Sequence, residues 1–215
     1  MPDRESIDLF DAIHSTRAMR YLKPDPISDE VLWELLDAAI RGPSGGNSQG
    51  WGWLVVRDPE TKRQIAEWYL EGWNRSYGAN REQALAASAD GALGRVNYLS
   101  AEHLANHLAE APVWIMPVLQ GVGGRVNPRA GSSIYGAVQN LMLAARAHGI
   151  GSTLTTLHLG HEDDVNRLLG LPDGAVTMCL IPLGYPARGS FSRPRRRPVE
   201  EVTHWDRWGE QRERG

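Results

Sequence analysis

The ten residues Gly42-Pro-Ser-Gly-Gly-Asn-Ser-Gln-Gly-Trp51 are the most informative stretch of this chain. They lie between residues 28–40, which have the apolar spacing of an amphipathic helix, and residues 53–56, which have the composition of a strand. Small residues leave the backbone exposed and the amide side chains add hydrogen-bonding groups, so such a loop can approach a flat polar ligand closely. An ordinary connection between a helix and a strand is the alternative interpretation.

Basic clusters lie on either side of this loop in the sequence. The first contains Ser15, Thr16, Arg17 and Arg20, and the second is Arg193-Pro-Arg-Arg-Arg-Pro198. The planar guanidinium group of arginine suits a phosphate, and neighbouring hydroxyls add donors. Two such clusters around an amide-rich loop predict one phosphorylated ligand with a polar ring. A solvated basic face is the alternative for the arginine run.

Length and composition indicate one soluble domain. The 215 residues are enough for a sizeable core, no Pro/Gly/Ser linker divides them, and the domain is therefore expected to span residues 1–215. The net charge of −3 supports neither a nucleic-acid nor a membrane-surface partner. No apolar run reaches the roughly 18 residues of a membrane span, and residues 1–6 lack the pattern of a signal peptide. The single cysteine, Cys179, cannot form an internal disulfide, which fits a reducing cytoplasm.

Helices and strands are interleaved along the chain. The apolar spacing predicts helices over residues 6–14, 28–40, 58–71, 100–110, 132–147 and 162–169, and strands over residues 53–56, 112–119, 150–156 and 176–183. The helix over residues 132–147 is apolar on more than one face, so we expect it to be buried on more than one side.

Residues 72–98 lose this regular pattern. They contain many Gly, Asn, Ser and Ala residues and few large apolar ones, with some helical character over residues 81–89. We predict that this segment contributes little to the core and forms a mobile cover. A solvent-facing insertion is the alternative.

Motifs for several other chemistries are missing from the sequence. The seven histidines include one helical i, i+4 pair, His103 and His107, without the glutamate of a zinc protease helix, so we expect no metal site. Gly121-Val-Gly-Gly124 does not form a Rossmann motif, and neither a Gly-x-Ser-x-Gly elbow nor a Walker loop occurs. This lack of an acid, base or nucleophile constellation favours a protein whose cofactor brings its own reactivity.

Several short motifs follow one another in a defined order. They are Arg17-Ala-Met-Arg20, Pro24-Asp-Pro26, Pro43-Ser-Gly-Gly-Asn-Ser-Gln49, Gln139-Asn140-Leu-Met-Leu-Ala-Ala145, Leu168-Leu-Gly-Leu-Pro172, Leu183-Gly-Tyr-Pro186 and Arg196-Arg-Pro-Val-Glu-Glu-Val202. In this order and spacing the chain resembles the nitroreductase family of FMN-dependent oxidoreductases over nearly its whole length. The resemblance implies an α+β protein, an α/β three-layer sandwich with a central, mostly antiparallel sheet flanked by helices, assembled as an intertwined dimer.

The resemblance implies bound FMN, with NAD(P)H as a transient electron donor. By position, the residues that match the family's FMN-binding residues are Ser15, Thr16, Arg17, Arg20 and Arg196 (or Arg195) for the phosphate, Pro43, Ser44, Asn47 and Gln49 for the isoalloxazine and ribityl chain, and Gln139, Thr155 and Thr156 beside the ring. Many members have Arg-Arg-Ser-hydrophobic-Arg where this chain has Thr16-Arg-Ala-Met-Arg20.

The family's substrate pocket is roofed by the segment that corresponds to residues 72–98. This makes Trp73, Tyr77 and Tyr98, together with Gly46, the candidate substrate contacts. The implied reaction transfers hydride from NAD(P)H and then reduces a small aromatic or conjugated acceptor, such as a nitroaromatic or quinone-like compound, by a ping-pong mechanism.

Two alternatives remain open for the function. One is a specialised member, either a biosynthetic flavin dehydrogenase or a dehalogenase, which a Glu, Tyr and Lys clamp for a substrate zwitterion would favour; no lysine follows Lys62. The other is a module that binds FMN or senses redox state without turnover.

Three features predict an obligate homodimer with two FMN sites. The helix over residues 132–147 resembles the family's interface helix, and the loop at residues 42–51 resembles loops that reach the partner's site. Residues 199–215, with Trp205 and Trp208 spaced i, i+3, resemble an amphipathic arm in need of an apolar surface.

Overall fold

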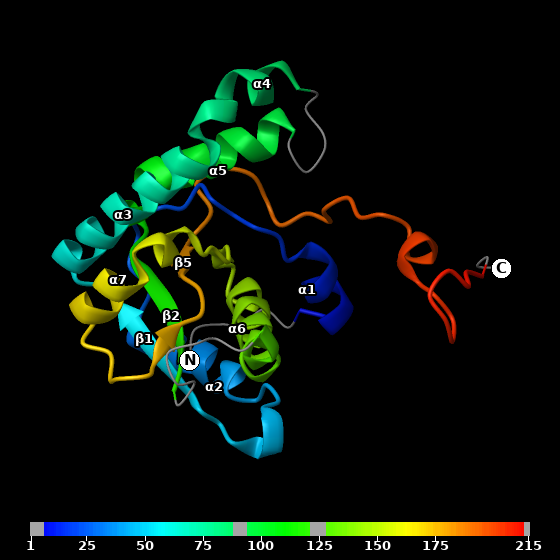
Figure 1. Cartoon of the computed structure of the whole chain (residues 1–215), viewed down its shortest axis with the longest axis horizontal. Coiled ribbons are helices and arrows are strands. Elements are labelled where there is room, and N and C mark those ends of the chain that lie inside the picture. Colours follow the sequence, from blue (N-terminus) through cyan, green and yellow to red (C-terminus); the bar gives the residue numbers. More distant parts are fainter. Residues whose placement is uncertain (1–6, 88–93, 121–127, 213–215) are drawn as a thin grey trace.

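A β-sheet between two layers of helices forms the centre of the protein, as Figure 1 shows. The computed structural model describes residues 7–87, 94–120 and 128–212. The helices are α1 (Leu9–Ser15), α2 (Asp29–Ala39), α3 (Pro59–Tyr77), α4 (Arg81–Ala86), α5 (Arg95–His107), α6 (Tyr135–Ala147) and α7 (Glu162–Leu168). The strands are β1 (Trp51–Val56), β2 (Val113–Leu119), β3 (Gly151–Ser152), β4 (Val176–Thr177) and β5 (Ile181–Gly184). Within these ranges, no helix is long and apolar enough to span a membrane.

The sheet is antiparallel at each pairing of its strands. Its order is β1-β2-β5-β3, and β4 also pairs with β2. Ala18 adds a parallel bridge to Ser152 beside β3. The strand expected over residues 150–156 is shorter than predicted, because after β3 the chain makes an isolated bridge, Thr155 to Leu180. The mostly antiparallel sheet of an α+β protein is confirmed.

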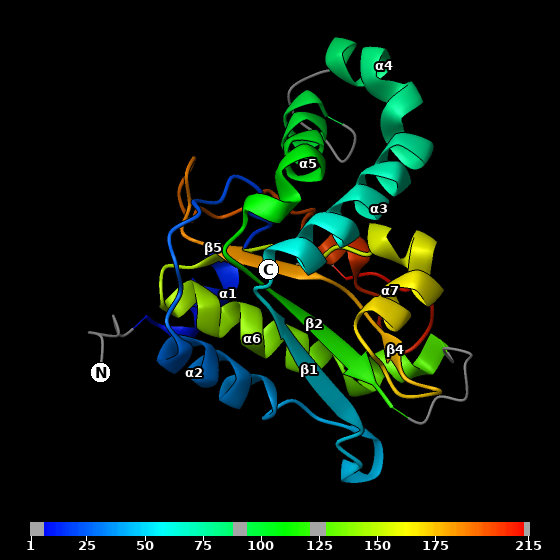
Figure 2. The ribbon, with the colours of Figure 1, turned by 90° about the vertical axis from the view of Figure 1, so that its left-hand side faces the viewer.

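Strand β2 separates two apolar cores. Its residues are all buried, and their side chains alternate between the two faces of the sheet. Val113 and Ile115 belong to the core shared with α2 and α6, whereas Trp114 and Met116 belong to the core shared with α3, α5 and α7. Figure 2 shows α2 and α6 on one side of the sheet and α3 and α7 on the other. This arrangement is the predicted three-layer sandwich.

The strand predicted over residues 176–183 is split into β4 and β5. Ile115 pairs with Ile181, whereas Val118 pairs with Thr177. Between these two pairs β2 advances by three residues and the opposite segment advances by four, so that segment has one extra residue. Pro117 lies within this interval and has no N–H to donate, so the hydrogen-bond ladder is interrupted there and a bulge forms.

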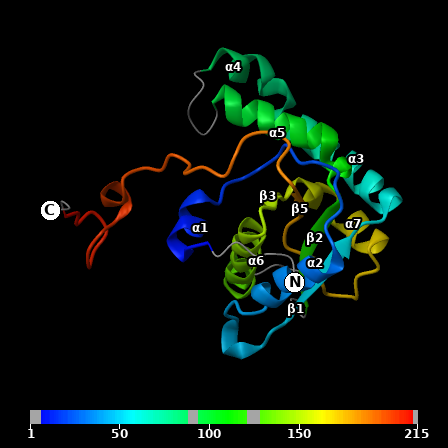
Figure 3. The same cartoon turned by 180° about the vertical axis from the view of Figure 1, so that it is seen from behind.

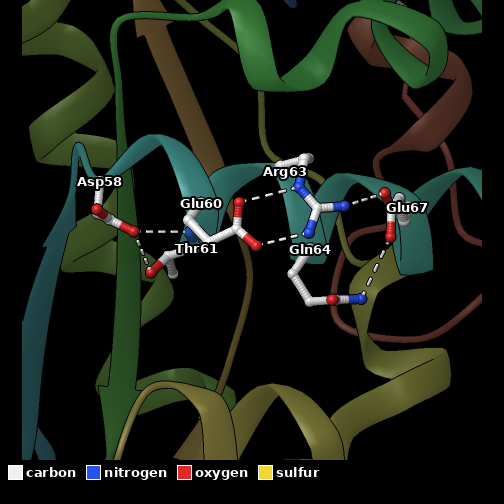
Figure 4. Close-up of polar contacts among 6 residues, drawn as sticks. All are labelled: Asp58, Glu60, Thr61, Arg63, Gln64 and Glu67. Atoms are coloured by element: carbon white, nitrogen blue, oxygen red, sulfur yellow. Dashed lines mark hydrogen bonds and ion pairs between the residues drawn. The ribbon is translucent and has the colours of Figure 1, made fainter.

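Helix α3 begins with a strong cap. The carboxylate of Asp58 accepts hydrogen bonds from the backbone N–H and the hydroxyl of Thr61, both at 2.7 Å. Arg63 forms ion pairs with Glu60 and Glu67 on the exposed face of the first two turns, as Figure 4 shows. These contacts follow the predicted Asp-Pro start of the helix.

The prediction that residues 72–98 contribute little to the core is wrong. Helix α3 continues to Tyr77, beyond its predicted end at residue 71, and Trp73, Ala84 and Tyr98 are buried. The Trp73 ring lies 5.0 Å from that of Tyr77 and 5.3 Å from that of Tyr98, centroid to centroid. A few aromatic rings bury enough area to hold a segment otherwise composed of small residues. Residues 88–93 lie outside the described residues.

The C-terminal arm extends away from the sheet. Figures 1 and 3 show it leaving the body of the protein beside α1. Trp205 and Trp208 are 46% and 90% exposed, and the guanidinium of Arg212 lies 4.4 Å from the centre of a Trp205 ring. An arm that needs an apolar surface on a second subunit stays a prediction.

The loop that precedes β1 is anchored on α6 by a glycine. A Cβ atom placed on Gly42 would lie 2.6 Å from the Cα and backbone N of Ala137, and Ala137 is fully buried. The backbones of the loop and the helix can therefore approach this closely only because residue 42 has no side chain.

Gly42→Ala should lower the free energy of unfolding by about 1–3 kcal/mol, because the added methyl group meets backbone atoms of α6 that cannot move alone. Gly78→Ala is the matched control: its Cβ would find the Asn74 side chain at 3.8 Å, an ordinary contact, and we expect a change within about 0.5 kcal/mol. Urea unfolding followed by circular dichroism measures both. Equal stability of the two variants would contradict the close packing at Gly42.

Candidate functional site

A cavity of about 410 Å³ lies between α3, α5 and residues 153–157. Six of the residues predicted from the sequence line it, namely Arg20, Trp73, Tyr77, Tyr98, Thr155 and Thr156. We call it the aromatic cavity. The structure thus brings three of the predicted cofactor residues together with three of the predicted substrate residues, although they come from four separate parts of the chain.

The two threonines differ in the contacts they make. The N–H of Thr155 donates to the Leu180 carbonyl at 3.0 Å and its carbonyl accepts from the Leu180 N–H at 2.8 Å. Its hydroxyl hydrogen-bonds the buried phenol of Tyr69 at 2.8 Å. Thr156 is exposed, and its hydroxyl bonds to no residue in the described ranges. Thr155 therefore holds the segment in place, and Thr156 is available to a ligand.

Arg20 supplies the charge in the aromatic cavity. Its Nη1 donates to the hydroxyl of Ser100 on α5 at 3.0 Å. Burial is the main cause that lowers the pKa of Arg20, and the nearby Arg17 lowers it further while Tyr69 opposes the shift. An arginine remains protonated despite such a shift, so the cavity contains a partly desolvated cation.

Tyr69 is the main residue of this cavity that the sequence analysis missed. It is 3% exposed, and burial raises the pKa of its phenol, which therefore stays neutral. A usable signal exists, because Tyr69, Trp73 and Tyr77 are spaced i, i+4 and i+8 and so share one face of α3. No comparable signal marks Ser100 or Asn97, which reach the cavity region from α5.

A second cavity, of about 520 Å³, lies between α1, α6 and residues 191–193. Ser15 lines it, and its hydroxyl accepts from Arg146 Nε of α6 at 2.9 Å. Arg17 Nη1 donates to the hydroxyl of Ser192 in the same wall, also at 2.9 Å. The predicted N-terminal cluster is therefore divided: Ser15 lines this α1 cavity, Arg17 bonds to Ser192 of its lining, and Arg20 lines the aromatic cavity.

Several predicted cofactor residues line neither cavity. The Thr16 hydroxyl donates back to the Ala12 carbonyl at 2.7 Å. Gln139 is exposed on α6. Arg196 is exposed on the C-terminal segment, where its Nη1 donates to the Arg195 carbonyl at 3.1 Å.

The loop at residues 42–51 also lies away from both cavities. Figure 2 shows it beyond the end of β1, at the opposite end of the molecule from α4 and α5. The residues predicted from it, Pro43, Ser44, Gly46, Asn47 and Gln49, are absent from both linings. One chain does not bring this loop to the aromatic residues.

The loop nevertheless has a defined shape. The Gly45 N–H donates to the Ser133 hydroxyl at 3.1 Å, and the Gln49 N–H donates to the Ser44 hydroxyl at 3.0 Å. Asn47 and Gln49 have φ angles of 53° and 48°, in the left-handed region that side chains disfavour. Such conformations persist only where surrounding contacts impose them, and they concentrate at ligand-binding positions.

Comparison with known proteins agrees with this architecture. The family model described as "Nitroreductase family" matches residues 13–185. The chain belongs to the nitroreductase family. Its sequence is 31% identical to that of an NADH dehydrogenase of Thermus thermophilus, over 93% of this chain and 96% of the relative. It is 26% identical to rat iodotyrosine deiodinase 1, over 86% of this chain but 64% of the longer relative.

A solved nitroreductase-like structure shows the same fold. Iodotyrosine deiodinase bound to FMN and 3-iodo-L-tyrosine has a TM-score of 0.70 with this chain, covers 92% of it and 100% of its own chain, and is 24% identical. The family and the fold of the single chain predicted from the sequence are therefore confirmed, whereas the intertwined dimer stays a prediction. The roles assigned to individual residues stay predictions.

In this nitroreductase fold the segment after Thr156 contains a buried histidine. His158 lies in the 3₁₀ turn Leu157–His161 and is fully buried; its Nε2 lies 3.3 Å from the Thr177 hydroxyl. Its Nδ1 has no hydrogen-bond partner among the described residues. Burial lowers the pKa of His158 to about 4. Elsewhere in the described ranges, no three His, Cys, Asp or Glu side chains form a cluster that could hold a metal ion.

His158 should make this protein less stable in acid. The unfolded chain binds a proton at His158 near pH 6.5 and the folded chain only near pH 4, so stability is complete above pH 6.5 and is lost as the pH falls through that window. His158→Gln should remove as much as about 3 kcal/mol of this pH dependence. His14→Gln, at an exposed position, is the control. Urea unfolding at pH 7 and pH 4 tests this; a parent-to-His158→Gln difference that is the same at both pH values would contradict it.

Proposed function

We propose that this protein is an FMN-dependent oxidoreductase that takes hydride from NAD(P)H and reduces a small aromatic or conjugated acceptor. Membership of the nitroreductase family supports the class of reaction, and the relative named NADH dehydrogenase supports the donor. The observation that carries the proposal is the aromatic cavity, which is lined by the cation Arg20, the hydroxyl of Thr156 and four aromatic rings.

The residues present fit FMN in their chemistry. At the α1 cavity, the guanidinium groups of Arg17 and Arg146 offer donors suited to a phosphate. The Ser15 hydroxyl already donates to the Asp11 carbonyl, and of the two carboxylates in this lining Asp8 caps α1 and Asp11 pairs with Arg193. At the aromatic cavity, Arg20 and Thr156 offer donors to the polar edge of a ring. Bound FMN supplies the two-electron chemistry that links a nicotinamide donor to an acceptor.

The chain's own residues would bind the flavin and the substrate, orient them and shield them from water. Arg20 would provide positive charge near a reduced ring. Because its hydrogen bond to Ser100 already holds the guanidinium in place, it would stabilise negative charge on that ring without moving. Thr156 offers a hydroxyl for a hydrogen bond, while the Tyr69 to Thr155 contact fixes the backbone from which Thr156 projects. Trp73, Tyr77 and Tyr98 give an apolar surface for a flat substrate and reduce its contact with water.

We also propose that a second subunit completes each site. The loop bearing Ser44, Gly46 and Asn47 is remote from the aromatic residues of its own chain, so it serves the site of a partner. Exposed apolar side chains on α1, including Leu9 and Phe10, and on the C-terminal arm offer surface for this partner. The buried free thiol of Cys179 is consistent with a cytoplasmic location.

Anaerobic reduction tests the proposed activity. The purified protein should be yellow, should be bleached by NADH or NADPH, and should recover its colour when a nitroaromatic or quinone is added. A yellow protein that neither nucleotide bleaches would instead support a non-catalytic FMN-binding module. A protein that neither retains nor binds FMN would contradict the proposal.

Arg17→Ala and Arg146→Ala should each weaken FMN binding by roughly 1.5–3 kcal/mol, the scale of a hydrogen bond to a charged group. Arg167→Ala, at an exposed pair on α7, is the control and should bind FMN like the parent. Equilibrium dialysis or flavin fluorescence gives the dissociation constants. A variant that retains FMN as tightly as the parent would remove its arginine from the phosphate site.

The protein should be an obligate two-fold homodimer with two equivalent FMN sites and an interface larger than about 2,000 Å². Since each site needs both subunits, dilution that separates the subunits should release FMN at the same protein concentration. Light scattering reports the mass and flavin fluorescence reports the release. A monomer that holds one FMN tightly would show that the loop does not act across an interface.

A further inference from the structure

We propose that His103 is a positioning residue: its neutral imidazole, stacked against Tyr21, holds α5 beside Arg20, and a protonated imidazole holds the helix less firmly. Mild acid would therefore weaken binding at the aromatic cavity, one wall of which is α5. The inference rests on the proposed function for this effect on FMN. His103 does not line the cavity itself, so it acts through Tyr21 and α5.

Aromatic side chains from two parts of the chain form a stack on α5. The His103 ring lies 4.1 Å from that of Tyr21 and 4.3 Å from that of His107, centroid to centroid, with interplanar angles of 23° and 27°. The guanidinium of Arg188 lies 5.3 Å from the centre of the Tyr21 ring. These four side chains therefore connect α5 to the segment that carries Arg20 and to the segment that follows β5.

The backbone fixes the position of Tyr21. Leu22 forms an antiparallel bridge with Pro186, and the Ala187 N–H donates to the Tyr21 carbonyl at 2.9 Å. Figure 3 shows these two segments, in blue and orange, meeting beside α5. Tyr21 directly follows Arg20 in the chain, so a ring that packs on Tyr21 packs next to the segment that supplies the charge of the cavity.

Helix α5 carries the stack and the cavity wall at neighbouring positions. Ser100, which accepts the hydrogen bond from Arg20, lies three residues before His103 and so shares its side of the helix. Leu104, next to His103 in the sequence, is buried and lines the cavity. A movement of α5 away from Tyr21 would therefore stretch the contact between Arg20 and Ser100 and displace the wall.

The charges around the stack favour a neutral His103. Arg188 and a protonated His107 bring positive charge to it. Glu110 brings negative charge, but its Oε1 lies 2.7 Å from His107 Nδ1, so this carboxylate serves His107 rather than His103. Burial is the main cause that lowers the pKa of His103; His107 lowers it further, Glu110 opposes the shift and Arg188 adds to it.

The direction of the pH effect follows from this shift. An imidazole freed from the stack binds a proton near its ordinary pKa of 6.5, and the stacked imidazole binds it only at lower pH. The packing of α5 on Tyr21 is therefore fully stable above about pH 6.5 and loses stability as the pH falls below that value. A protonated ring would gain a cation–π contact with Tyr21, but Arg188 already makes such a contact with the same ring.

Histidine titration by NMR tests the protonation step. The full-length protein is titrated with and without FMN, and sequential assignment identifies each histidine signal. We expect His103 to titrate at a lower pH than His14, which is exposed on α1. A midpoint for His103 equal to or above that of His14 overturns the inference.

Hydrogen exchange tests how firmly α5 is held. Exchange of residues 95–107 is compared with that of β2, which reports global unfolding, at pH 7.5 and pH 5.5 after correction for the intrinsic rates. The protection of α5 relative to β2 should fall at least about threefold at the lower pH. Equal relative protection at the two pH values overturns the inference.

Three variants separate the charge of His103 from its packing. His103→Phe keeps a flat ring that does not titrate, so α5 should be protected as in the parent at pH 7.5 and equally well at pH 5.5. His103→Ala should lose protection at both pH values, and His14→Gln should keep the parent's pH dependence. A His103→Phe variant with the parent's pH dependence overturns the inference. The parent measurements need no variant, so they still decide if one misfolds.

Flavin binding separates this inference from the proposed function. Between pH 7.5 and pH 5.5 the dissociation constant of FMN should rise at least about threefold more in the parent than in His103→Phe. The phosphate of FMN titrates in the same range, so the comparison between the two proteins is the measurement. A protein that does not bind FMN contradicts the proposed function, and exchange and titration then decide on His103. Equal changes in parent and variant keep the proposed function and overturn the role of His103.

Discussion

The burial of β2 on both of its faces is the constraint on which the rest of the structure depends. Val113 and Ile115 on one side and Trp114 and Met116 on the other give each helical layer an apolar surface to cover. The indole N–H of Trp114 donates to the Leu108 carbonyl, so this buried polar atom is satisfied as well. The layer on the Trp114 side is the one from which the aromatic cavity is built.

The candidate site is therefore an extension of the core. Tyr69, Trp73 and Tyr98 belong to the same apolar cluster as Trp114 and Met116, and α3 and α5 place them around the cavity. Side chains fixed by core packing hold a ligand in one orientation better than side chains on a free loop. This explains why a segment with little apolar content can still supply a defined wall.

The shape of the loop at residues 42–51 has a different origin. Gly42 packs against α6, and Asn47 and Gln49 keep left-handed conformations, so the loop is shaped before any ligand arrives. The residues predicted to bind the ligand thus fall into two parts that do not meet within one chain. Assembly, rather than a conformational change of one chain, is the simplest way to bring such parts together.

The sequence by itself determined the family and such local elements as helix α2. The Ser28 cap and the apolar stripe of Val31, Leu32 and Leu35 define α2, because helical periodicity is a property of neighbouring residues. Only the tertiary structure decided which of Thr155 and Thr156 is available to a ligand. That choice depends on the phenol of Tyr69, 86 residues away in the chain, and contacts over such distances are set by packing of the layers, which no local pattern records.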